Sequence, residues 1–315
     1  MEQRKVILDC DPGHDDAFAM LMALASEKIE LIGVTTSAGN QVPEKTFNNA
    51  RKLLALAGRE DIPVAMGAKK PLIRELIIAD SVHGETGLDG ADLPEPTVDP
   101  QKISANKLLY DILSKEDKVT LVATGPLTNL AIFILSHPEL KDKIDMISFM
   151  GGAIFGGNYS PHAEFNIYVD PEAAKIVLDS GIPVAMFGLD VTLKAQIYQS
   201  DINEIRNLNN KVSTIMADLL DFFNLTTTYP FWAKQEHEEG VHMHDPCAMA
   251  YLIKPEIFDM YDMYVDIETS NTLSLGSTVV DYDNLYEKAP NAKVAYDLDL
   301  VEFKNIIFET LKYFG

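Results

Sequence analysis

Short apolar runs rich in β-branched residues alternate along this chain with longer segments in which apolar residues recur every three or four positions. The apolar runs predict strands at residues 5–9, 30–35, 64–66, 119–123, 146–150 and 184–189. The periodic segments predict helices at residues 16–26, 46–57, 105–114, 128–135, 171–180, 211–224 and 245–253. This alternation is typical of a parallel sheet flanked by helices.

The last part of the chain adds to this pattern. Alternating runs at residues 263–268 and 293–296 predict extra strands, and residues 300–313 predict a closing helix. We therefore expect an α/β fold with an open, mostly parallel sheet, a Rossmann-like core and a smaller, mainly helical C-terminal part. Because no repeat or Gly-, Pro- or Ser-rich linker interrupts the chain, we expect a single domain over residues 1–315.

The composition narrows the class of partner. Of the 315 residues 47% are hydrophobic, and the formal net charge is −22. Such a charge argues against nucleic acid or an anionic membrane surface as a partner. The first apolar run is too short for a signal peptide, no stretch is long enough to span a bilayer, and two cysteines are too few for a disulfide framework. We expect a cytoplasmic protein.

Four aspartates crowd into eight residues directly after the first predicted strand. They are Asp9, Asp11, Asp15 and Asp16. No lysine or arginine lies between Asp9 and Lys28 to neutralise them, and ionised carboxylates this close favour a bound cation. Two of them could instead only complement the dipole of a helix N-terminus, but this leaves Asp9 and Asp11 unexplained. Oxygen ligands without a neighbouring His or Cys pair favour Ca²⁺ or Mg²⁺ over zinc.

Small and polar residues follow the predicted strands at their carboxyl ends. The segments are Asp-Cys-Asp-Pro-Gly (9–13), Thr-Ser-Ala-Gly-Asn (36–40), Ala-Thr-Gly-Pro (123–126), Met-Gly-Gly (150–152) and Gly-Leu-Asp (188–190). Open parallel sheets bind ligands outside the carboxyl ends of their strands. The five segments therefore predict one shared site.

The stretch Val-His-Met-His-Asp-Pro at residues 241–246 places two histidines beside an aspartate. Its spacing matches no usual zinc motif. Asp245 followed by Pro246 is typical of a helix N-cap with proline at the first helical position. A capping carboxylate can also face a metal ion, so both roles stay open, and His244 could be either structural or catalytic.

Two loops carry further candidates. Asn158, Glu164 and Asn166 offer the donors and acceptors that sugar hydroxyls require, although an ordinary polar surface loop has the same composition. The glycine-rich stretch 82–90, which contains His83, could be a mobile flap or only a flexible turn.

The charge of the candidate stretches bears on the substrate. None of the stretches 9–17, 36–40, 123–126, 156–166 and 241–247 contains a lysine or arginine. Phosphate sites normally supply basic side chains or a glycine-rich phosphate loop. An acidic, cation-binding site better suits a neutral ligand whose transition state gains positive charge, as in cleavage of a glycosidic bond.

Eight motifs follow one another along the chain. They are Asp-Cys-Asp-Pro-Gly-His-Asp-Asp-Ala (9–17), Ala-Gly-Asn (38–40), His-Gly-Glu-Thr-Gly-Leu (83–88), Ala-Thr-Gly-Pro-Leu-Thr-Asn (123–129), Met-Gly-Gly (150–152), Glu-Phe-Asn (164–166), Asp-Pro-Glu-Ala-Ala (170–174) and His-Asp-Pro-Cys (244–247). In this order they resemble the inosine-uridine-preferring nucleoside hydrolase family over essentially the whole chain. The first motif, with His14, is most similar to the pyrimidine-preferring branch. The resemblance implies hydrolysis of ribonucleosides, uridine and cytidine first and inosine second, to base and ribose.

The resemblance also implies roles for single residues. Calcium would be bound by Asp11, Asp16, the backbone carbonyl of Thr124, and Asp245. The ribose would be held by Asp15, Asn40, Asn158, Glu164 and Asn166. Departure of the base would be assisted by His83 and His244. Asp11 would also be the general base toward a calcium-bound water, Asp9 would support the turn, and the protein would be a homo-oligomer, a dimer or tetramer.

Two other functions are compatible with part of the pattern. A haloacid-dehalogenase-like Mg²⁺ phosphatase also begins with strand-Asp-x-Asp, but it would have Asp-Gly-Thr after the second aspartate and a lysine in the site, and Asp11-Pro12-Gly13-His14 supplies neither. A non-catalytic nucleoside-binding protein would keep the same ligands without turnover. The stretch 229–240 departs from the family's aromatic-rich helix and Gly-rich approach to the base, so it leaves the base preference open.

Overall fold

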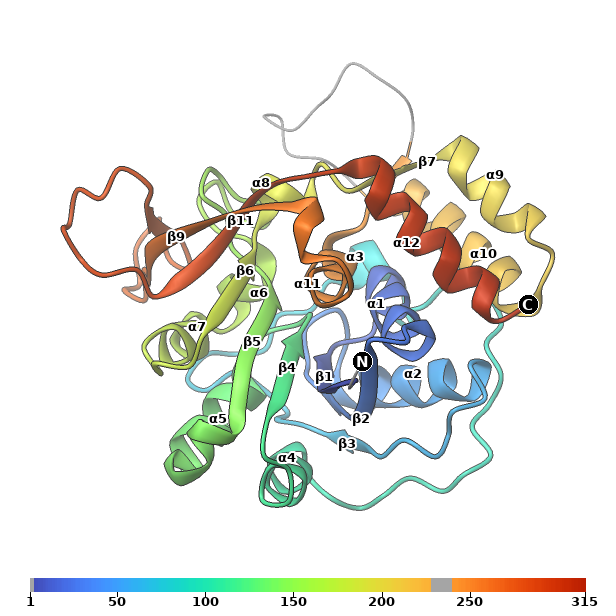
Figure 1. Ribbon diagram of the computed structural model, residues 1–315, viewed down its shortest axis with the longest axis horizontal. Helices are drawn as coiled ribbons and strands as arrows, with labels where there is room; N and C mark the ends of the chain where they lie inside the picture. Colours follow the sequence, from blue (N-terminus) through green and yellow to red (C-terminus); the bar gives the residue numbers. More distant parts are fainter. Residues whose placement is uncertain (1–2, 228–239) are drawn as a thin grey trace.

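The computed structural model describes residues 3–227 and 240–315. Within them, a nine-stranded sheet has the order β10-β9-β11-β6-β5-β4-β1-β2-β3 (Figure 1). The parallel strands are β1 (Arg4–Cys10), β2 (Ile29–Thr36), β3 (Val64–Met66), β4 (Val119–Ala123), β5 (Ile144–Met150), β6 (Val184–Phe187) and β11 (Ala292–Leu298). Strands β9 (Phe258–Ile267) and β10 (Thr278–Asp281) are antiparallel and extend one edge. The expected mostly parallel α/β sheet is confirmed.

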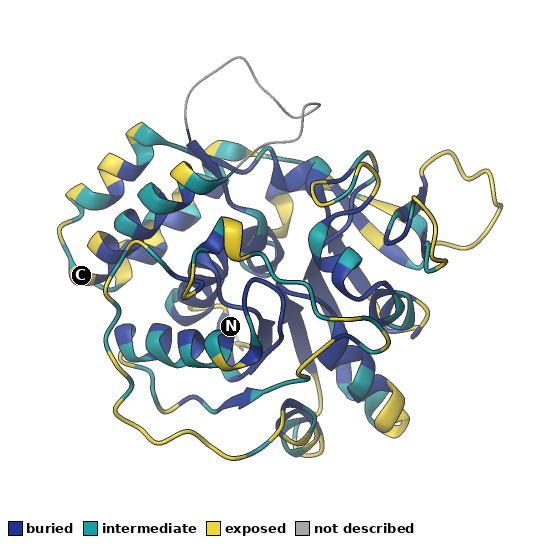
Figure 2. Cartoon of the chain, turned by 180° about the vertical axis from the view of Figure 1, so that it is seen from behind, coloured by how far each residue is buried: buried dark blue, intermediate teal, exposed yellow. Residues whose placement is uncertain are grey.

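Helices cover both faces of this sheet. One face packs against α1 (His14–Ala25), α2 (Pro43–Leu56), α10 (Lys211–Thr226), α11 (His244–Ile253) and α12 (Leu300–Tyr313). The other packs against α4 (Ala105–Leu113), α5 (Thr128–Ser136) and α7 (Pro171–Leu178). Strands that are buried on both faces have continuous apolar sequences. In β1, for example, the side chains of Val6 and Leu8 pack in the core on one face of the sheet and that of Ile7 in the core on the other face. Figure 2 shows these central strands buried between the helices.

Helix α1 lies inside the molecule rather than on its surface. Every residue from His14 to Leu24 is buried, because α11 lies beside α1 on the sheet and α10 and α12 also pack against α1. A helix that is apolar nearly all round is typical of such a position. The carboxylates at its first turn are therefore buried as well.

The remaining elements are short. They are α3 (Asp80–His83), α6 (Phe165–Val169), α8 (Leu189–Thr192), α9 (Gln199–Asn207), the antiparallel pair β7 (Gln196–Tyr198) and β8 (Gly240–His242), and the 3-10 helices η1 (Pro138–Lys143) and η3 (Pro255–Ile257). Helices α8 to α12 make the C-terminal part mainly helical, as expected. Among the described residues, no helix combines the length and the hydropathy needed to cross a membrane.

Most element boundaries differ by a few residues from the predictions, and three of the differences have a clear cause. The strand expected at 184–189 ends at Phe187, because Gly188 is the N-cap of α8. The strand expected at 263–268 begins at Phe258, where it pairs with β11. The helix expected to be capped by Asp245 begins one residue earlier, with Met243 as its N-cap. Asp245 thus lies within the first turn of α11, and its carboxylate does not serve as the cap.

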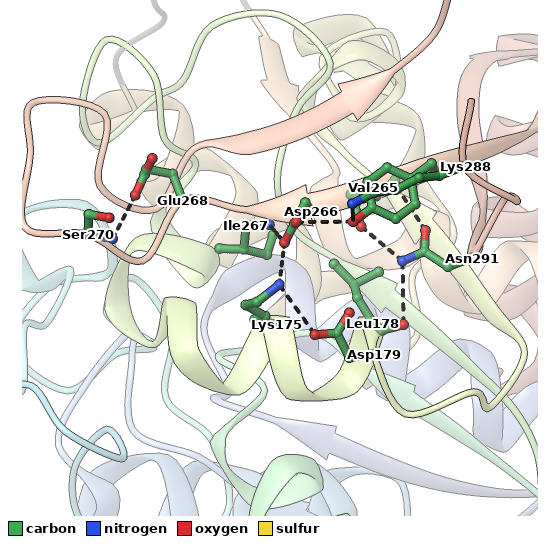
Figure 3. A network of polar contacts seen from close by, with 11 residues as sticks. Lys175, Leu178, Asp179, Val265, Asp266, Ile267, Glu268, Ser270, Lys288 and Asn291 are labelled. Carbon is green, nitrogen blue, oxygen red and sulfur yellow. Dashed lines mark hydrogen bonds and ion pairs between the residues drawn. The ribbon is translucent and has the colours of Figure 1, made fainter. Parts of the chain in front are cut away.

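The edge formed by β9 is fastened to α7 by polar side chains (Figure 3). Lys175 of α7 contacts Asp266 of β9 and Asp179 of its own helix. Asn291 Nδ2 donates to the carbonyl oxygen of Val265 at 2.9 Å. Partly exposed ion pairs contribute about 0–1 kcal/mol each, so this network fixes where the added strands sit more than it stabilises the fold.

The strand order reverses between β1 and β4. The chain passes from β1 to β2 and β3 at one edge, then crosses back and continues through β4, β5 and β6 on the other side of β1. In open α/β sheets such a reversal leaves a crevice at the carboxyl ends of the two strands, and ligands bind there. Asp11 follows β1 and Thr124 follows β4, so both lie at this crevice.

Candidate active site

Four buried carboxylates meet at the crevice. Asp11 comes from the turn after β1, Asp15 and Asp16 from the first turn of α1, and Asp245 from the first turn of α11; none is more than 4% exposed. Carboxylate oxygens of Asp15, Asp16 and Asp245 lie within 4.8 Å of one another. Asp11 is joined to this group through Asn40, whose amide N–H donates to Asp11 Oδ2 at 2.6 Å and whose Nδ2 donates to Asp16 Oδ2 at 3.0 Å.

Asp16 caps the N-terminus of α1 and also belongs to the carboxylate cluster, so both roles that its sequence position allowed are filled. Its Oδ2 accepts the amide N–H of Gly13 at 2.9 Å and so caps α1. Its Oδ1 accepts the hydroxyl of Thr124 at 2.6 Å, which ties α1 to the end of β4. Capping therefore does not turn this carboxylate away from the cluster.

Asp15 joins the beginning of the chain to α11. Its Oδ2 accepts the amide N–H of His244 at 3.1 Å and that of Asp245 at 3.3 Å. A carboxylate at a helix N-terminus is favoured by the free amides and the helix dipole. This contact brings Asp245 to Asp16, although 229 residues separate His244 from Asp15 in sequence.

The carboxylate of Asp11 fits between two glycines. A Cβ atom added to Gly39 would lie 2.2 Å from Asp11 Oδ2, and one added to Gly125 would lie 2.2 Å from Asp11 Oδ1. Among the described residues, no group donates a hydrogen bond to Asp11 Oδ1, although this atom is buried. A buried acceptor without a donor is costly, and a cation or a water molecule would satisfy it.

The electrostatics of the cluster lead to the same conclusion. Burial, followed by the charges of neighbouring aspartates, raises the pKa of Asp11 and of Asp245 well above the ordinary range. Burial and the charge of Asp16 raise the pKa of Asp15 to about 7. Carboxylate and carbonyl oxygens are the ligands that hard divalent cations prefer. The donor set therefore fits such a cation, which would neutralise carboxylates that burial alone would protonate.

A cavity of about 200 Å³ opens above the cluster. Nine of the predicted site residues line it: Asp15, Asn40, His83, Thr124, Asn158, Glu164, Asn166, His244 and Asp245. Asp11 and Asp16 lie beneath this lining and are fully buried. Apolar and aromatic side chains, Tyr159, Phe165 and Phe223 among them, form much of the remaining wall, and the described lining includes no lysine or arginine.

Glu164 organises one side of the cavity through backbone amides. Its carboxylate accepts the N–H groups of Gly152 at 2.9 Å, Asn166 at 2.9 Å and Ile167 at 3.2 Å, and thereby caps α6. Burial raises its pKa to about 7, against the effect of these amides. Asn166 Nδ2 in turn donates to the carbonyl oxygen of Thr124 at 2.9 Å. The sugar candidates and the metal candidates thus belong to one hydrogen-bond network.

Asn158 is oriented by the same segment. Its Oδ1 accepts the amide N–H of Phe165 at 3.0 Å. The side-chain amide therefore keeps its two N–H donors for a ligand. The polar stretch that carries Asn158, Glu164 and Asn166 therefore forms part of the cavity wall and is not an ordinary surface loop.

Two histidines face the cavity, and each is held by a residue to which the sequence analysis gave no task. His244 Nδ1 lies 2.7 Å from the hydroxyl of Thr192, and His83 Nδ1 lies 3.1 Å from Nδ1 of His14. Burial lowers the pKa of His244 to about 3 and that of His83 well below its ordinary value. These partners lie 52 and 69 residues away along the chain, so no local spacing could have indicated them.

The glycine-rich loop after α3 is anchored rather than free. Gln41 Nε2 donates to the carbonyl oxygens of Gly84 and Glu85, both at 3.1 Å. Asn49 Nδ2 donates to the carbonyl oxygen of Thr86 at 2.9 Å. Residues 82–90 thus form a turn that these hydrogen bonds tie to the body of the protein, which differs from both expected alternatives, a mobile flap and a flexible turn. In the stretch 229–240, which was expected to approach the base, all but Gly240 lies outside the described residues.

Comparison with known proteins identifies the family of this chain. Residues 6–305 match the profile of the family described as inosine-uridine preferring nucleoside hydrolase. The chain is 53% identical over 312 residues to the pyrimidine-specific ribonucleoside hydrolase RihA of Shewanella baltica strain OS185, covering 99% of this chain and 97% of that one. It is 52% identical over 309 residues to RihA of Photobacterium profundum, covering 98% of both.

A solved structure of a related enzyme has the same fold as this chain. The purine-preferring ribonucleoside hydrolase of Gardnerella vaginalis has the same fold, with a TM-score of 0.89 and 31% identity over 98% of both chains. The family profile spans nearly all of the chain, and the motifs within it supply the walls of one cavity. The protein is an enzyme that belongs to the inosine-uridine preferring nucleoside hydrolase family.

Proposed function

We propose that this enzyme is a Ca²⁺-dependent hydrolase of pyrimidine ribonucleosides, which splits uridine and cytidine into base and ribose and accepts inosine as a further substrate. The observation that carries the proposal is the buried carboxylate cluster beneath a cavity whose described lining has no basic side chain. Such a site suits a neutral ligand that becomes positively charged in the transition state.

Asp11, Asp16, Asp245 and the carbonyl oxygen of Thr124 would hold the ion. The unpartnered Oδ1 of Asp11 supports its assignment as a ligand. Bound Ca²⁺ would lower the pKa of a coordinated water and neutralise the carboxylates. Asp15 lies as close to Asp16 and Asp245 as a ligand would. We assign it to the substrate because the family resemblance places this residue on the ribose hydroxyls; lining the cavity does not decide its role, since Thr124 and Asp245 line it too.

The ribose would be held from two sides. Asp15 and Asn40 would bind its 2′- and 3′-hydroxyls at the floor of the cavity. Asn158, Glu164 and Asn166 would bind it toward the 5′-hydroxyl, with the donors of Asn158 and the acceptor of Asn166 that the network leaves open. Holding the sugar at several points fixes the anomeric carbon against the attacking water.

The reaction then follows from these positions. Asp11 takes the proton of the attacking water as general base. Positive charge that develops on the ribose as the bond to the base breaks is stabilised by the surrounding carboxylates. The departing base receives a proton from His244 or from solvent. Direct attack by water predicts inversion at the anomeric carbon.

The preference for pyrimidines rests on the relatives. Those at 52–53% identity are named pyrimidine-specific, whereas the purine-preferring enzyme of known structure is 31% identical. We also propose a cytoplasmic dimer or tetramer built from a single domain over residues 1–315. Light scattering of the purified protein and cell fractionation would test the assembly and the location.

The proposal is tested by measuring free ribose from uridine, cytidine, inosine and adenosine in phosphate-free buffer, with and without Ca²⁺. We expect ribose from uridine and cytidine first, and its loss in EDTA. Equal or greater release from the purine nucleosides would overturn the preference. Tight nucleoside binding without ribose would indicate a non-catalytic binding protein. Phosphate release from a nucleoside monophosphate, with no reaction on nucleosides, would favour the phosphatase alternative.

A further inference from the structure

A second histidine lies behind His83. His14 is fully buried at the start of α1, and its Nδ1 lies 3.1 Å from Nδ1 of His83. On the other side of its ring, Nε2 lies 2.8 Å from the backbone carbonyl oxygen of Asp89. The result is a line of polar contacts from a loop backbone, through His14, to a ring that borders the cavity. The proposed chemistry leaves His14 without a task.

The partners of His14 determine where its proton lies. A carbonyl oxygen can only accept, so His14 Nε2 carries the hydrogen and donates it to Asp89. In the neutral ring, Nδ1 of His14 is then an acceptor. The hydrogen between the two Nδ1 atoms must come from His83. The amide N–H of His14 also approaches His83 Nδ1, but at 3.4 Å it is the weaker contact.

The surrounding rings hold His14 in this orientation. It stacks on Phe222 and Phe223 with interplanar angles of 9° and 3°, and its ring plane differs from that of His83 by 22°. The approach of His83 also requires a glycine at position 13, because a Cβ atom there would lie 2.5 Å from His83 Nδ1. Neither ring can turn without losing these contacts.

The carbonyl of Asp89 is fixed as well. The Asp89 carboxylate accepts the amide N–H of Glu85 at 2.8 Å and that of Thr86 at 3.0 Å. It thereby closes the loop that Gln41 and Asn49 tie to the body of the protein. The acceptor at the far end of the line is part of a fixed turn.

We propose that His14 is a positioning residue that keeps the proton of His83 on Nδ1, so that His83 presents Nε2 to the cavity as a hydrogen-bond acceptor. Among the described residues, no group is bonded to His83 Nε2. That atom would accept an N–H or amino hydrogen of the bound base, and the proton for the departing base would come from His244 or solvent. The identity of this donor rests on the proposed function; the position of the proton does not.

The first test reads the proton directly. In protein labelled with ¹⁵N-histidine, the ring nitrogen shifts distinguish the two neutral tautomers, and the His83→Gln variant identifies the His83 signals. We expect His83 to carry its proton on Nδ1 in the resting enzyme. A proton on Nε2 would overturn the proposal. Failure to release ribose would overturn the proposed function and leave this result unaffected.

The second test removes the acceptor. His14→Phe keeps a stacked ring but offers His83 no partner, so we expect signals of the Nε2–H tautomer and a fall in kcat/KM for uridine of about tenfold, the value of one lost hydrogen bond. His14→Asn places an oxygen near the position of Nδ1 and should keep the native tautomer and most of the activity. His137→Phe, the same change outside the cavity, should alter neither.

An unchanged tautomer and unchanged kcat/KM in His14→Phe would contradict the assignment. Should that variant fail to fold, the native spectrum and His14→Asn still decide. Loss of the Nδ1–H tautomer in His14→Asn would also count against the proposal, because that variant keeps the acceptor.

Discussion

Single residues in this site carry charges that burial disfavours. Asp11 shows the conflict most clearly: its carboxylate lies between Gly39 and Gly125, its pKa is raised by burial and by the charge of Asp16, and its Oδ1 is buried without a donor among the described residues. The same oxygen that destabilises the ion-free protein is the one best placed to bind an ion and to accept a proton.

Asp11→Asn therefore separates stability from activity. We expect kcat to fall by about 10³-fold, because the proposed general base is lost, and Ca²⁺ binding to weaken. In EDTA the variant should melt at a higher temperature than the native enzyme, since an amide removes the cost of burying or protonating this carboxylate. Ribose release, calorimetric titration with Ca²⁺ and thermal unfolding measure the three effects.

Asp145→Asn, an exposed aspartate, is the matched control and should change none of these quantities. Near-normal turnover in Asp11→Asn would remove Asp11 from the mechanism.

Thr192 offers a test of His244 that leaves the cavity lining intact. Thr192→Val removes the hydroxyl that lies 2.7 Å from His244 Nδ1 and keeps the volume nearly unchanged. Loss of one hydrogen bond of about 1 kcal/mol predicts a roughly fivefold fall in kcat with little change in KM. Steady-state kinetics with uridine measure the two constants.

Thr128→Val is the comparison, because it loses a buried hydroxyl bonded to Asp170 at 2.6 Å outside the cavity. Thr128→Val should lower the free energy of unfolding and leave kcat unchanged. Equal effects of the two variants on kcat would show that Thr192 acts only on the fold.

The grouping of the N-terminal aspartates at one site could be predicted, because they are neighbours in the sequence and follow a strand. The pairs His14–His83 and Thr192–His244 could not, since each joins residues far apart in the chain whose local surroundings look ordinary. The role of Asp245 could be only half predicted: its place at the start of a helix was expected, but as the N-cap. It lies within the first turn instead, and Asp15 binds the amides of α11.

At the scale of elements, most of the long and regular ones were predicted, although α9 was missed, and most of the short ones were not, although β3 was predicted. The buried strands β1, β4 and β5 and the helices α1, α10 and α12 have patterns strong enough to stand alone. Helices α3 and α6 have four and five residues, too few to form without tertiary contacts. These short helices carry His83 and Asn166, so the parts of the fold that position substrate groups were the least visible in the sequence.

Helix α6 yields a prediction of its own. Glu164→Ala removes the acceptor of three amides, so we expect a loss of about 1–2 kcal/mol in unfolding free energy and a rise in KM for uridine as Asn166 loses its support. Urea unfolding and steady-state kinetics measure the two effects.

Asp299→Ala is the matched control, because Asp299 caps α12 through the amides of Val301 and Glu302. It should show a similar loss of stability with an unchanged KM. If Glu164→Ala also leaves KM unchanged, Glu164 is only a cap.

At the scale of the whole molecule, the parallel sheet could be predicted from alternation, but its order could not. That β11 lies between β6 and β9 follows from contacts across the chain and from the side chains that fasten β9 to α7. The sequence therefore predicts the class of fold and the edge of the sheet that carries the site, and leaves the arrangement of the C-terminal strands open.

Stability as a function of pH is a property of the whole buried cluster. Burial raises the pKa values of Asp9 and Asp15 from 3.8 to about 7, so between pH 4 and 7 the folded state binds more protons than the unfolded state. In EDTA the free energy of unfolding should therefore fall as the pH rises across this range. Moving the pKa of Asp9 alone corresponds to about 4 kcal/mol.

Urea unfolding in EDTA at several pH values measures this slope. Saturating Ca²⁺ should make it shallower by keeping the ligands ionised in the folded state. Asp9→Asn, which changes no proposed ligand, should reduce the slope in EDTA. An unfolding free energy that increases from pH 4 to 7 in EDTA would contradict the prediction.

The contact of Asp15 with the amides of His244 and Asp245 has a consequence for the order in which the enzyme is made. During synthesis the N-terminal aspartates leave the ribosome first, and α11 follows only after more than two hundred further residues have been added. Until then the cluster lacks Asp245 and the cavity lacks His244, so the nascent chain holds its crowded carboxylates without the partner that completes their site. Contacts between residues so distant in sequence form late in folding, and hydrolytic activity should therefore arise in one step, when α11 packs against the aspartates that follow β1.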